Sequence, residues 1–125
     1  MLAVVGAPGC ADRERAAIET TLEARADALR ALDLKRYAPL VSEHYNADGR
    51  NREAVLQRFA SFATLKPPIV YEVLSRDVQR TDRRAVVVES YVLAFETTKG
   101  HQEVRDTAEF VLEKEGSVWR FVGGL

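Results

Sequence analysis

An aspartate on an apolar strand face is the residue whose type and position point most directly to chemistry. Side chains alternate between the two faces of a β-strand, so Asp106 shares its face with Ala108, Phe110 and Leu112. A carboxylate there is costly unless it is paired or protonated, and such groups are common in functional sites. A shifted register would instead let Asp106 pair with an arginine of a helix, which is a structural role. Asp106 is therefore either a site residue or one half of a buried ion pair.

Four more polar side chains could join Asp106 around a ligand pocket. Glu89 and Tyr91 share one face of the preceding strand, and two tyrosines come from the helical half of the chain. A carboxylate and a phenol together can bind a polar ligand group or exchange protons with it. The full set of pocket candidates is Asp106, Tyr91, Tyr37, Tyr45 and Glu89. No residue is assigned a catalytic role.

Other chemistries have no motif in this sequence. His44 and His101 lack a second ligand at metal spacing, and the chain has a single cysteine, so we expect no metal site. Neither a glycine-rich phosphate loop nor a nucleophile elbow is present, so we expect no cofactor. Eighteen basic and nineteen acidic residues give a net charge of −1, which argues against nucleic acid as a partner. A cluster of arginines is interpreted as a solvated hairpin tip: Arg76, Arg80, Arg83 and Arg84.

The elements that must position the pocket candidates divide the chain into a helical half and a strand half. Apolar residues at three- and four-residue spacing predict a helix over residues 12–32 and another over 52–63, with Asn51 as its cap. Asp33 is expected to cap a short helix between them, which Pro39 makes irregular. The sequence Lys66-Pro67-Pro68 ends the last helix. Strands are predicted over residues 69–80, 85–98, 101–115 and 117–122.

These elements predict an α+β fold. Short connections between long strands indicate hairpins, and hence one antiparallel meander. Strands of this length must twist and bend to stay compact. We expect the three N-terminal helices to pack on the concave side of the curved sheet, which gives a cone-shaped domain with an interior cavity. The predicted occupant of that cavity is a small apolar ligand.

The second predicted strand is apolar on both faces, which indicates that both faces are covered. The face opposite Glu89 and Tyr91 carries Val86, Val88, Val92 and Ala94. The simplest cover for this convex side of the sheet is a second copy of the domain. The sequence therefore predicts a homodimer through the convex face.

Three short motifs and the C-terminal stretch resemble a known family. The motifs are Ala31-Leu32-Asp33-Leu34, Ser42-Glu43-His44-Tyr45 and Asp48-Gly49-Arg50-Asn51-Arg52-Glu53. The ending runs Phe110-Val111-Leu112-Glu113-Lys114-Glu115-Gly116-Ser117-Val118-Trp119-Arg120-Phe121. In order and spacing they resemble the nuclear transport factor 2-like superfamily, which includes the SnoaL-like cyclases and ketosteroid isomerase. The resemblance covers residues 12–125.

The resemblance implies a fold and leaves the activity open, because this superfamily contains isomerases, dehydratases, cyclases, transport adaptors and domains without assigned activity. In ketosteroid isomerase, inward carboxylates and a tyrosine perform proton transfer and bind the oxyanion. Asp106 with Tyr91, Tyr37 or Tyr45 would be comparable. The position of that enzyme's general base falls near Asp48 and Gly49, in a turn and out of register. We therefore expect a small-ligand-binding or interaction domain, with an acid–base isomerase, dehydratase or cyclase as the alternative.

The N-terminal residues resemble the tail of a bacterial lipoprotein signal. Small and apolar residues from Leu2 to Gly9 precede Cys10, and a charged helix follows. A basic segment before the apolar stretch is missing, and Pro8 is unusual in such signals. We divide the chain into residues 1–11, a flexible segment or signal remnant, and the domain 12–125. Either Cys10 is lipidated and the protein is a periplasmic or membrane-anchored lipoprotein, or the segment is a frayed terminus and the protein is cytoplasmic.

Overall fold

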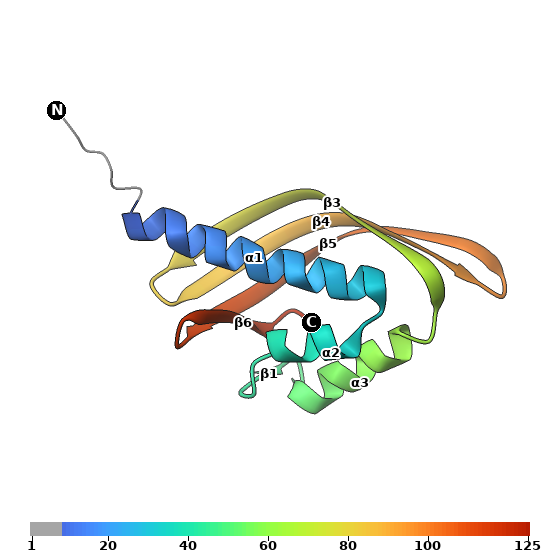
Figure 1. The fold of residues 1–125 in the computed structure, drawn as a ribbon, viewed down its shortest axis with the longest axis horizontal. Coiled ribbons are helices and arrows are strands. Elements are labelled where there is room, and N and C mark those ends of the chain that lie inside the picture. The colour runs from blue at the N-terminus through green and yellow to red at the C-terminus, as the bar shows by residue number, and fades with distance from the viewer. Residues whose placement is uncertain (1–8) are drawn as a thin grey trace.

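The computed structural model describes the backbone of residues 9–125 and the side chains from Arg13 onward. A helical half is followed by a long antiparallel sheet, as Figure 1 shows. The helical half comprises α1 (Gly9–Ala31), α2 (Leu34–Tyr37), the 3-10 turn η2 (Ala38–Leu40), the short strands β1 (Asn46–Ala47) and β2 (Arg50–Asn51), and α3 (Arg52–Phe62). The sheet comprises β3 (Lys66–Thr81), β4 (Arg84–Thr97), β5 (Gly100–Glu115) and β6 (Val118–Gly123).

The predicted helix boundaries in the middle of the chain are confirmed by their caps. The Asp33 carboxylate accepts hydrogen bonds from the backbone N–H groups of Lys35 and Arg36, at 3.0 and 3.3 Å. Asn51 accepts one from the N–H of Ala54 at 2.9 Å. These side chains satisfy donors that have no partner inside a first helical turn. The second helix is irregular as predicted, because α2 gives way to a 3-10 turn that contains Pro39.

The strand half is the predicted antiparallel meander, with strand order β3-β4-β5-β6. The strands are somewhat longer than expected at their ends, since β3 begins at Lys66 and β5 at Gly100. A register shift lies between Val73 and Ser75 on β3, where one extra residue is accommodated opposite β4. The predicted turn after the second helix is more regular than expected, because β1 and β2 pair across it.

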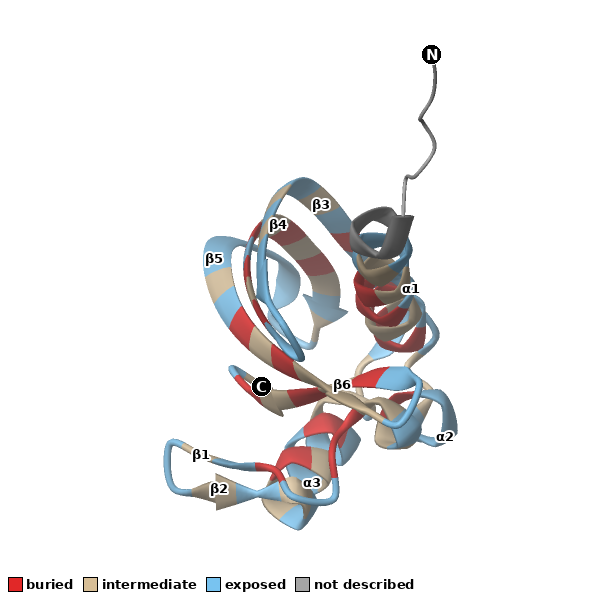
Figure 2. Ribbon diagram, turned by 90° about the vertical axis from the view of Figure 1, so that its left-hand side faces the viewer, coloured by how far each residue is buried: buried red, intermediate tan, exposed pale blue. Residues whose placement is uncertain are grey.

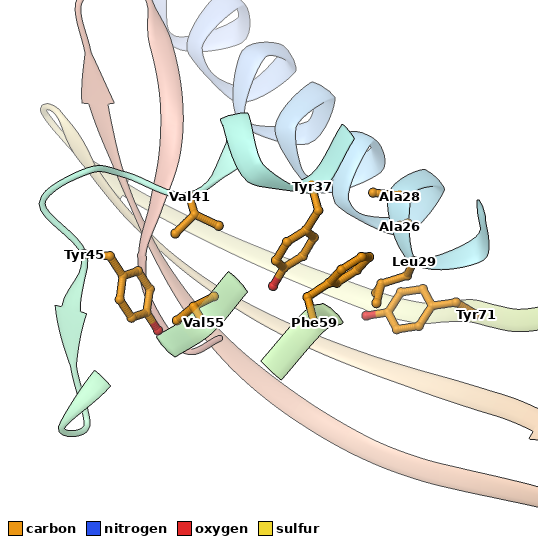
Figure 3. Packing of buried hydrophobic residues seen from close by; sticks show 9 residues of the cluster. All are labelled: Ala26, Ala28, Leu29, Tyr37, Val41, Tyr45, Val55, Phe59 and Tyr71. Atoms are coloured by element: carbon orange, nitrogen blue, oxygen red, sulfur yellow. The ribbon is translucent and has the colours of Figure 1, made fainter. Parts of the chain in front are cut away.

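Two hydrophobic clusters hold the helices and the sheet together. One joins the N-terminal part of α1 to the sheet, through Ile18, Leu22, Ala85, Val87, Phe110, Leu112, Trp119 and Phe121. The other joins the C-terminal part of α1 to α2, α3 and β3, and its residues are drawn in Figure 3. Figure 2 shows the long strands curving around the side on which α1 lies. Buried residues of α1 and of the strands pack together in the first of these clusters. The apolar stripe predicted for the first helix is thus buried against the sheet.

The apolar outer face of β4 is largely covered without a second chain. Val92 and Ala94 are buried, Val86 is half-buried, and Val88 is 37% exposed. The outer-face side chains of β4 are covered because β4 lies between two long strands, β3 and β5, whose side chains flank them. The apolarity on both faces of β4 is therefore accounted for within one chain. The homodimer through this face stays a prediction.

Candidate functional site

A cavity of about 250 Å³ lies between the helices and the inner face of the sheet. Its walls are mainly aromatic and aliphatic, and they include two arginines and three tyrosines. The lining residues are Arg25, Leu29, Tyr37, Val55, Arg58, Phe59, Phe62, Tyr71, Tyr91, Leu93, Ala108, Phe110, Gly124 and Leu125. Figure 3 shows Tyr37, Phe59 and Tyr71 pointing into the same region from three different elements. Mostly apolar walls with a few polar groups are typical of small-molecule sites.

Arg25 is the polar centre of this cavity. Its side chain reaches in from α1 and is only 15% exposed. The guanidinium carbon lies 4.5 Å from the ring centre of Phe110 and 5.6 Å from that of Tyr71, so both rings make cation–π contacts with it. Nη1 donates to the Tyr71 hydroxyl at 3.1 Å, whereas the buried Nε has no partner among the described residues. Arg25 is therefore positioned with hydrogen-bonding capacity unused.

A buried carboxylate lies behind Arg25. Glu89 is 1% exposed, and its Oε1 accepts a hydrogen bond from Nε of Arg76 at 2.6 Å. Its Oε2 accepts one from the hydroxyl of Tyr71 and lies 3.9 Å from Nη1 of Arg25. Arg76 continues outward to Glu23 on α1, at 2.8 Å. The result is a chain of ion pairs and hydrogen bonds that links α1, β3 and β4.

A β-bulge explains why Arg76 faces inward. Tyr71 and Val73 lie opposite Leu93 and Tyr91 on the inner face of the sheet. The shift between Val73 and Ser75 reverses the alternation, so the even-numbered Arg76 now lies on the inner face, directly opposite Glu89. Without the extra residue, Arg76 would point outward. The interpretation of Arg76 as part of a solvated hairpin tip is wrong for this reason, whereas Arg80, Arg83 and Arg84 are exposed around the turn.

The charges inside the site leave Arg25 incompletely neutralised. Glu89 is shared between two guanidinium groups, and it lies 2.6 Å from Arg76 but 3.9 Å from Arg25. Burial on its own lowers the pKa of Arg25, but Tyr37, Tyr71 and Glu89 raise that pKa above its ordinary value. The guanidinium thus stays charged while its nearest carboxylate is committed elsewhere. An electron-rich ligand group would complete its coordination.

Three tyrosines of the cavity stay neutral over a wide pH range. Burial raises the pKa of Tyr37 and that of Tyr71, and the charge of Arg25 opposes this rise in both. Burial also raises the pKa of Tyr91, and the charge of Asp106 adds to it. Tyr37 stacks on Phe59 with 4.1 Å between ring centres, and Tyr91 stacks on Tyr71 with 5.2 Å. The phenols therefore act as hydrogen-bond donors and ring walls at neutral pH.

The five predicted pocket residues fall into different places. Tyr37 and Tyr91 line the cavity, and Glu89 lies behind its wall. Tyr45 is buried beside the cavity, where its hydroxyl accepts a hydrogen bond from the N–H of Leu125 at 2.9 Å. Asp106 is opposite Tyr91 in the sheet, but it is exposed and accepts a hydrogen bond from the N–H of Thr107.

The expectation that Asp106 is buried, and with it the buried ion pair, is therefore wrong, whereas a role of Asp106 in ligand binding stays a prediction. The buried residues of β5 are Phe110 and Leu112, in or next to the part that pairs with β6, whereas Asp106 lies in the segment 100–107, where every residue is exposed. Sequence reasoning also missed Arg25, Tyr71 and Arg58. Arg25 sits beside the buried stripe of α1 next to Ala26, and a long cation bordering such a stripe was the available signal.

The remaining predicted groups lie away from the cavity. His101 contacts Glu96 through Nδ1 at 2.6 Å on the exposed end of the β4–β5 hairpin, and His44 is exposed. No cluster of three metal-ligating side chains occurs in the described part of the chain. Among its helices, none has the length and apolar character needed to cross a membrane. Cys10 falls in the first turn of α1, but its side chain is not among those described. Residues 1–8 lie outside the described part of the chain.

Comparison with solved structures relates this architecture to known proteins. A candidate dehydratase of the NTF2-like family from Streptomyces avermitilis aligns with a TM-score of 0.78 at 13% identity, covering 89% of this chain and 93% of its own. A candidate aromatic ring hydroxylase from Novosphingobium aromaticivorans aligns with a TM-score of 0.79 at 14% identity, covering 91% and 87%. A candidate calcium/calmodulin-dependent protein kinase II association domain from Xanthomonas campestris aligns with 0.68 at 25% identity, covering 96% and 88%.

The similarity lies in the structure. Neither a scan of protein-family models nor a search of curated proteins finds a match. The solved structures nevertheless align over most of both chains, which confirms the resemblance first suggested by the order of the helix and strand motifs. The chain therefore has the fold of the nuclear transport factor 2-like superfamily.

Proposed function

We propose that this domain binds a small, ring-containing ligand in its cavity, with an acidic or other electron-rich group of the ligand facing Arg25. The observation that carries the proposal is a buried, charged guanidinium that lines an aromatic-walled cavity and lies 3.9 Å from the carboxylate of Glu89. In this proposal the curved sheet forms the wide wall of a cone, and α1, α2 and α3 close it. A ligand would enter between the helices and the projecting part of the sheet.

The size of the cavity sets the size of the ligand. A cavity of about 150 Å³ is enough for a benzene molecule in a protein core. The cavity here measures about 250 Å³, which fits a ligand of one ring with substituents or two fused rings. The stacked pairs Tyr37–Phe59 and Tyr71–Tyr91 offer flat walls to such a ring.

The polar groups set the chemical class. Arg25 brings one positive charge to the lining, and Arg58 adds a second. Two cations and the hydroxyls of Tyr37 and Tyr91 favour a carboxylate, a phenolate or a carbonyl oxygen over a cationic group, whereas the Tyr71 hydroxyl already donates to Glu89. The name of one structural neighbour, a candidate aromatic ring hydroxylase, agrees with a cyclic ligand.

Binding is favoured over acid–base catalysis because of how Glu89 is held. A general base needs a free carboxylate oxygen within hydrogen-bond reach of its substrate. Both oxygens of Glu89 already accept hydrogen bonds, from Arg76 and from Tyr71. Proton abstraction by Glu89 would require this ion pair to open. Acid–base catalysis would therefore require the Arg76–Glu89 ion pair to open, whereas ligand binding would not.

The test compares matched ligands by calorimetry and by thermal unfolding. Benzoate and its 4-hydroxy derivative are measured against benzamide and methyl benzoate, which keep the ring and remove the charge. We expect the carboxylates to raise the unfolding temperature most, because a ligand that binds only the folded state stabilises it. Arg25→Lys should retain part of this preference and Arg25→Met should remove it. Equal effects of charged and uncharged ligands, or none at all, would contradict the proposal.

A further inference from the structure

The sheet has two edges, and they are built differently. The outer edge strand β3 contains Pro67 and Pro68 and carries the bulge after Val73. Arg30 covers this edge at Tyr71, because its Nε and Nη2 donate hydrogen bonds to the Tyr71 carbonyl oxygen at 3.1 and 2.8 Å. Prolines, bulges and cover by another element are the usual means of preventing an edge strand from pairing. The β3 edge is thus protected.

The other edge lacks these features over much of its length. β6 pairs with β5 only from Val111 to Glu115, so residues 100–108 of β5 have a partner on one side only, namely β4. The pairing with β4 runs from Gly100 to Glu113 without a register shift, and the segment contains no proline. Residues 100–107 are all exposed. We refer to residues 100–108 as the free edge.

The hydrogen-bonding groups of the free edge can be assigned from neighbouring contacts. The N–H of Lys114 donates to the carbonyl of Arg83 at 2.9 Å, on the β4 side. Backbone groups of successive residues in a strand point to opposite sides, so odd-numbered residues of β5 point away from β4. Gly124 agrees, because it packs so closely on the carbonyl oxygen of Glu109 that a Cβ would not fit. The free edge therefore offers the backbone groups of His101, Glu103, Arg105 and Thr107.

We propose that the free edge of β5 pairs with the same edge of a second copy of this chain, antiparallel and centred on Val104. A twofold axis at Val104 places Glu103 of each copy opposite Arg105 of the other. These residues carry opposite charges, and both are exposed. Within one chain they already lie 3.8 Å apart on the same face, so the dimer would hold a group of four alternating charges.

The charge pattern selects this register over its neighbours. An axis at Glu103 or at Arg105 would place two like charges directly opposite each other, which is unfavourable. An axis at Thr107 would place Arg105 of one copy opposite Glu109 of the other, which is a favourable charge pair, but it would shorten the paired segment. With the axis at Val104, the two copies pair over residues 100–108 and exchange about eight backbone hydrogen bonds.

Val104 supplies the apolar centre of the contact. It is 39% exposed, one of the few large hydrophobic side chains on the surface of the described residues. Its own backbone groups point to β4, so the two Val104 residues would meet at a position without hydrogen bonds between the copies, where side chains approach most closely. The pairing would extend each four-stranded sheet into one continuous sheet through both copies.

Charge reversal tests the proposal in the full chain. Sedimentation velocity over a wide concentration range should show a monomer–dimer equilibrium. Arg105→Glu should raise the dissociation constant about tenfold or more, because it sets two pairs of acidic residues against each other. The double variant Glu103→Arg with Arg105→Glu should restore dimerisation. Both positions are exposed, so circular dichroism should show an unchanged fold.

The matched control is Val88→Glu, on the outer face of β4. We expect it to leave the dimer intact. A dimer that is lost with Val88→Glu but kept with Arg105→Glu would assign the association to the outer face and overturn the proposal. A chain that stays monomeric at every concentration would overturn it too, as would a dimer that neither charge variant changes.

Discussion

Arg76 and Glu89 lie directly opposite each other on β3 and β4, and their side chains join at 2.6 Å with Glu89 almost fully buried. The pair stands at the point where the sheet meets α1, because Arg76 also binds Glu23 and Glu89 approaches Arg25. One interaction thus ties two strands to the helix that supplies the polar centre of the cavity.

Replacing Glu89 with glutamine should destabilise the protein strongly. The change leaves Arg76 and Arg25 without their shared buried carboxylate, and breaking such a pair costs about 3 kcal/mol or more. Urea unfolding followed by circular dichroism would measure the loss. Glu72→Gln, on the exposed outer face of β3, is the matched control and should change the free energy of unfolding by less than about 0.5 kcal/mol. Equal effects of the two variants would show that the buried ion pair contributes little.

Filling the cavity should abolish ligand binding with little loss of stability. Ala108 lines the cavity opposite Glu89, so Ala108→Leu adds apolar volume to an existing space. We expect the carboxylate-dependent rise in unfolding temperature to disappear, while the free energy of unfolding changes by less than about 1.5 kcal/mol. Gln79→Leu adds the same side chain on an exposed part of β3 and should leave binding intact. Undiminished binding by Ala108→Leu would place the ligand elsewhere.

The tyrosines of the cavity should make the protein lose stability above about pH 10, the ordinary tyrosine pKa. The folded-state pKa values of Tyr37, Tyr71 and Tyr91 are raised, so between pH 10 and those values the unfolded chain has released protons that the folded chain retains. With respect to these groups, stability is therefore constant below about pH 10 and falls above it, by about 1.4 kcal/mol per pH unit for each of the buried Tyr37 and Tyr71 and by less for the half-buried Tyr91.

Ultraviolet absorbance of the phenolate measures this titration directly. At least three of the four tyrosines should ionise at higher pH in the folded protein than in the urea-unfolded chain. Tyr37→Phe should remove one of the delayed transitions and flatten the alkaline fall in stability. Identical absorbance curves for the folded and unfolded chains would contradict the burial of these hydroxyls.

The lipid anchor at Cys10 stays a prediction from the sequence. Expression from the gene together with its upstream region should place the protein in the membrane fraction, with an intact mass that begins at Cys10 and includes acyl chains. Cys10→Ala should move the protein to the soluble fraction. A soluble wild-type product that retains residues 1–9 would show that no anchor is attached and would favour the cytoplasmic alternative.

The sequence by itself determined the order and type of the elements. Capping by Asp33 and Asn51, the proline that distorts the second helix, and the short turns between long strands all act within a few residues of one another. Such local effects do not depend on distant parts of the chain. They were sufficient to predict three helices, a four-stranded antiparallel meander and the family resemblance.

Only the tertiary structure decided which polar side chains share the interior. The bulge before Ser75 reverses the direction of Arg76, and strand alternation alone does not reveal where an extra residue will be accommodated. Asp106 keeps its predicted face but lies in the part of β5 that β6 does not pair with, so the same alternation that buries Phe110 leaves Asp106 in solvent. Arg25 enters the cavity because α1 lies across the sheet, and that contact joins residues distant in the sequence.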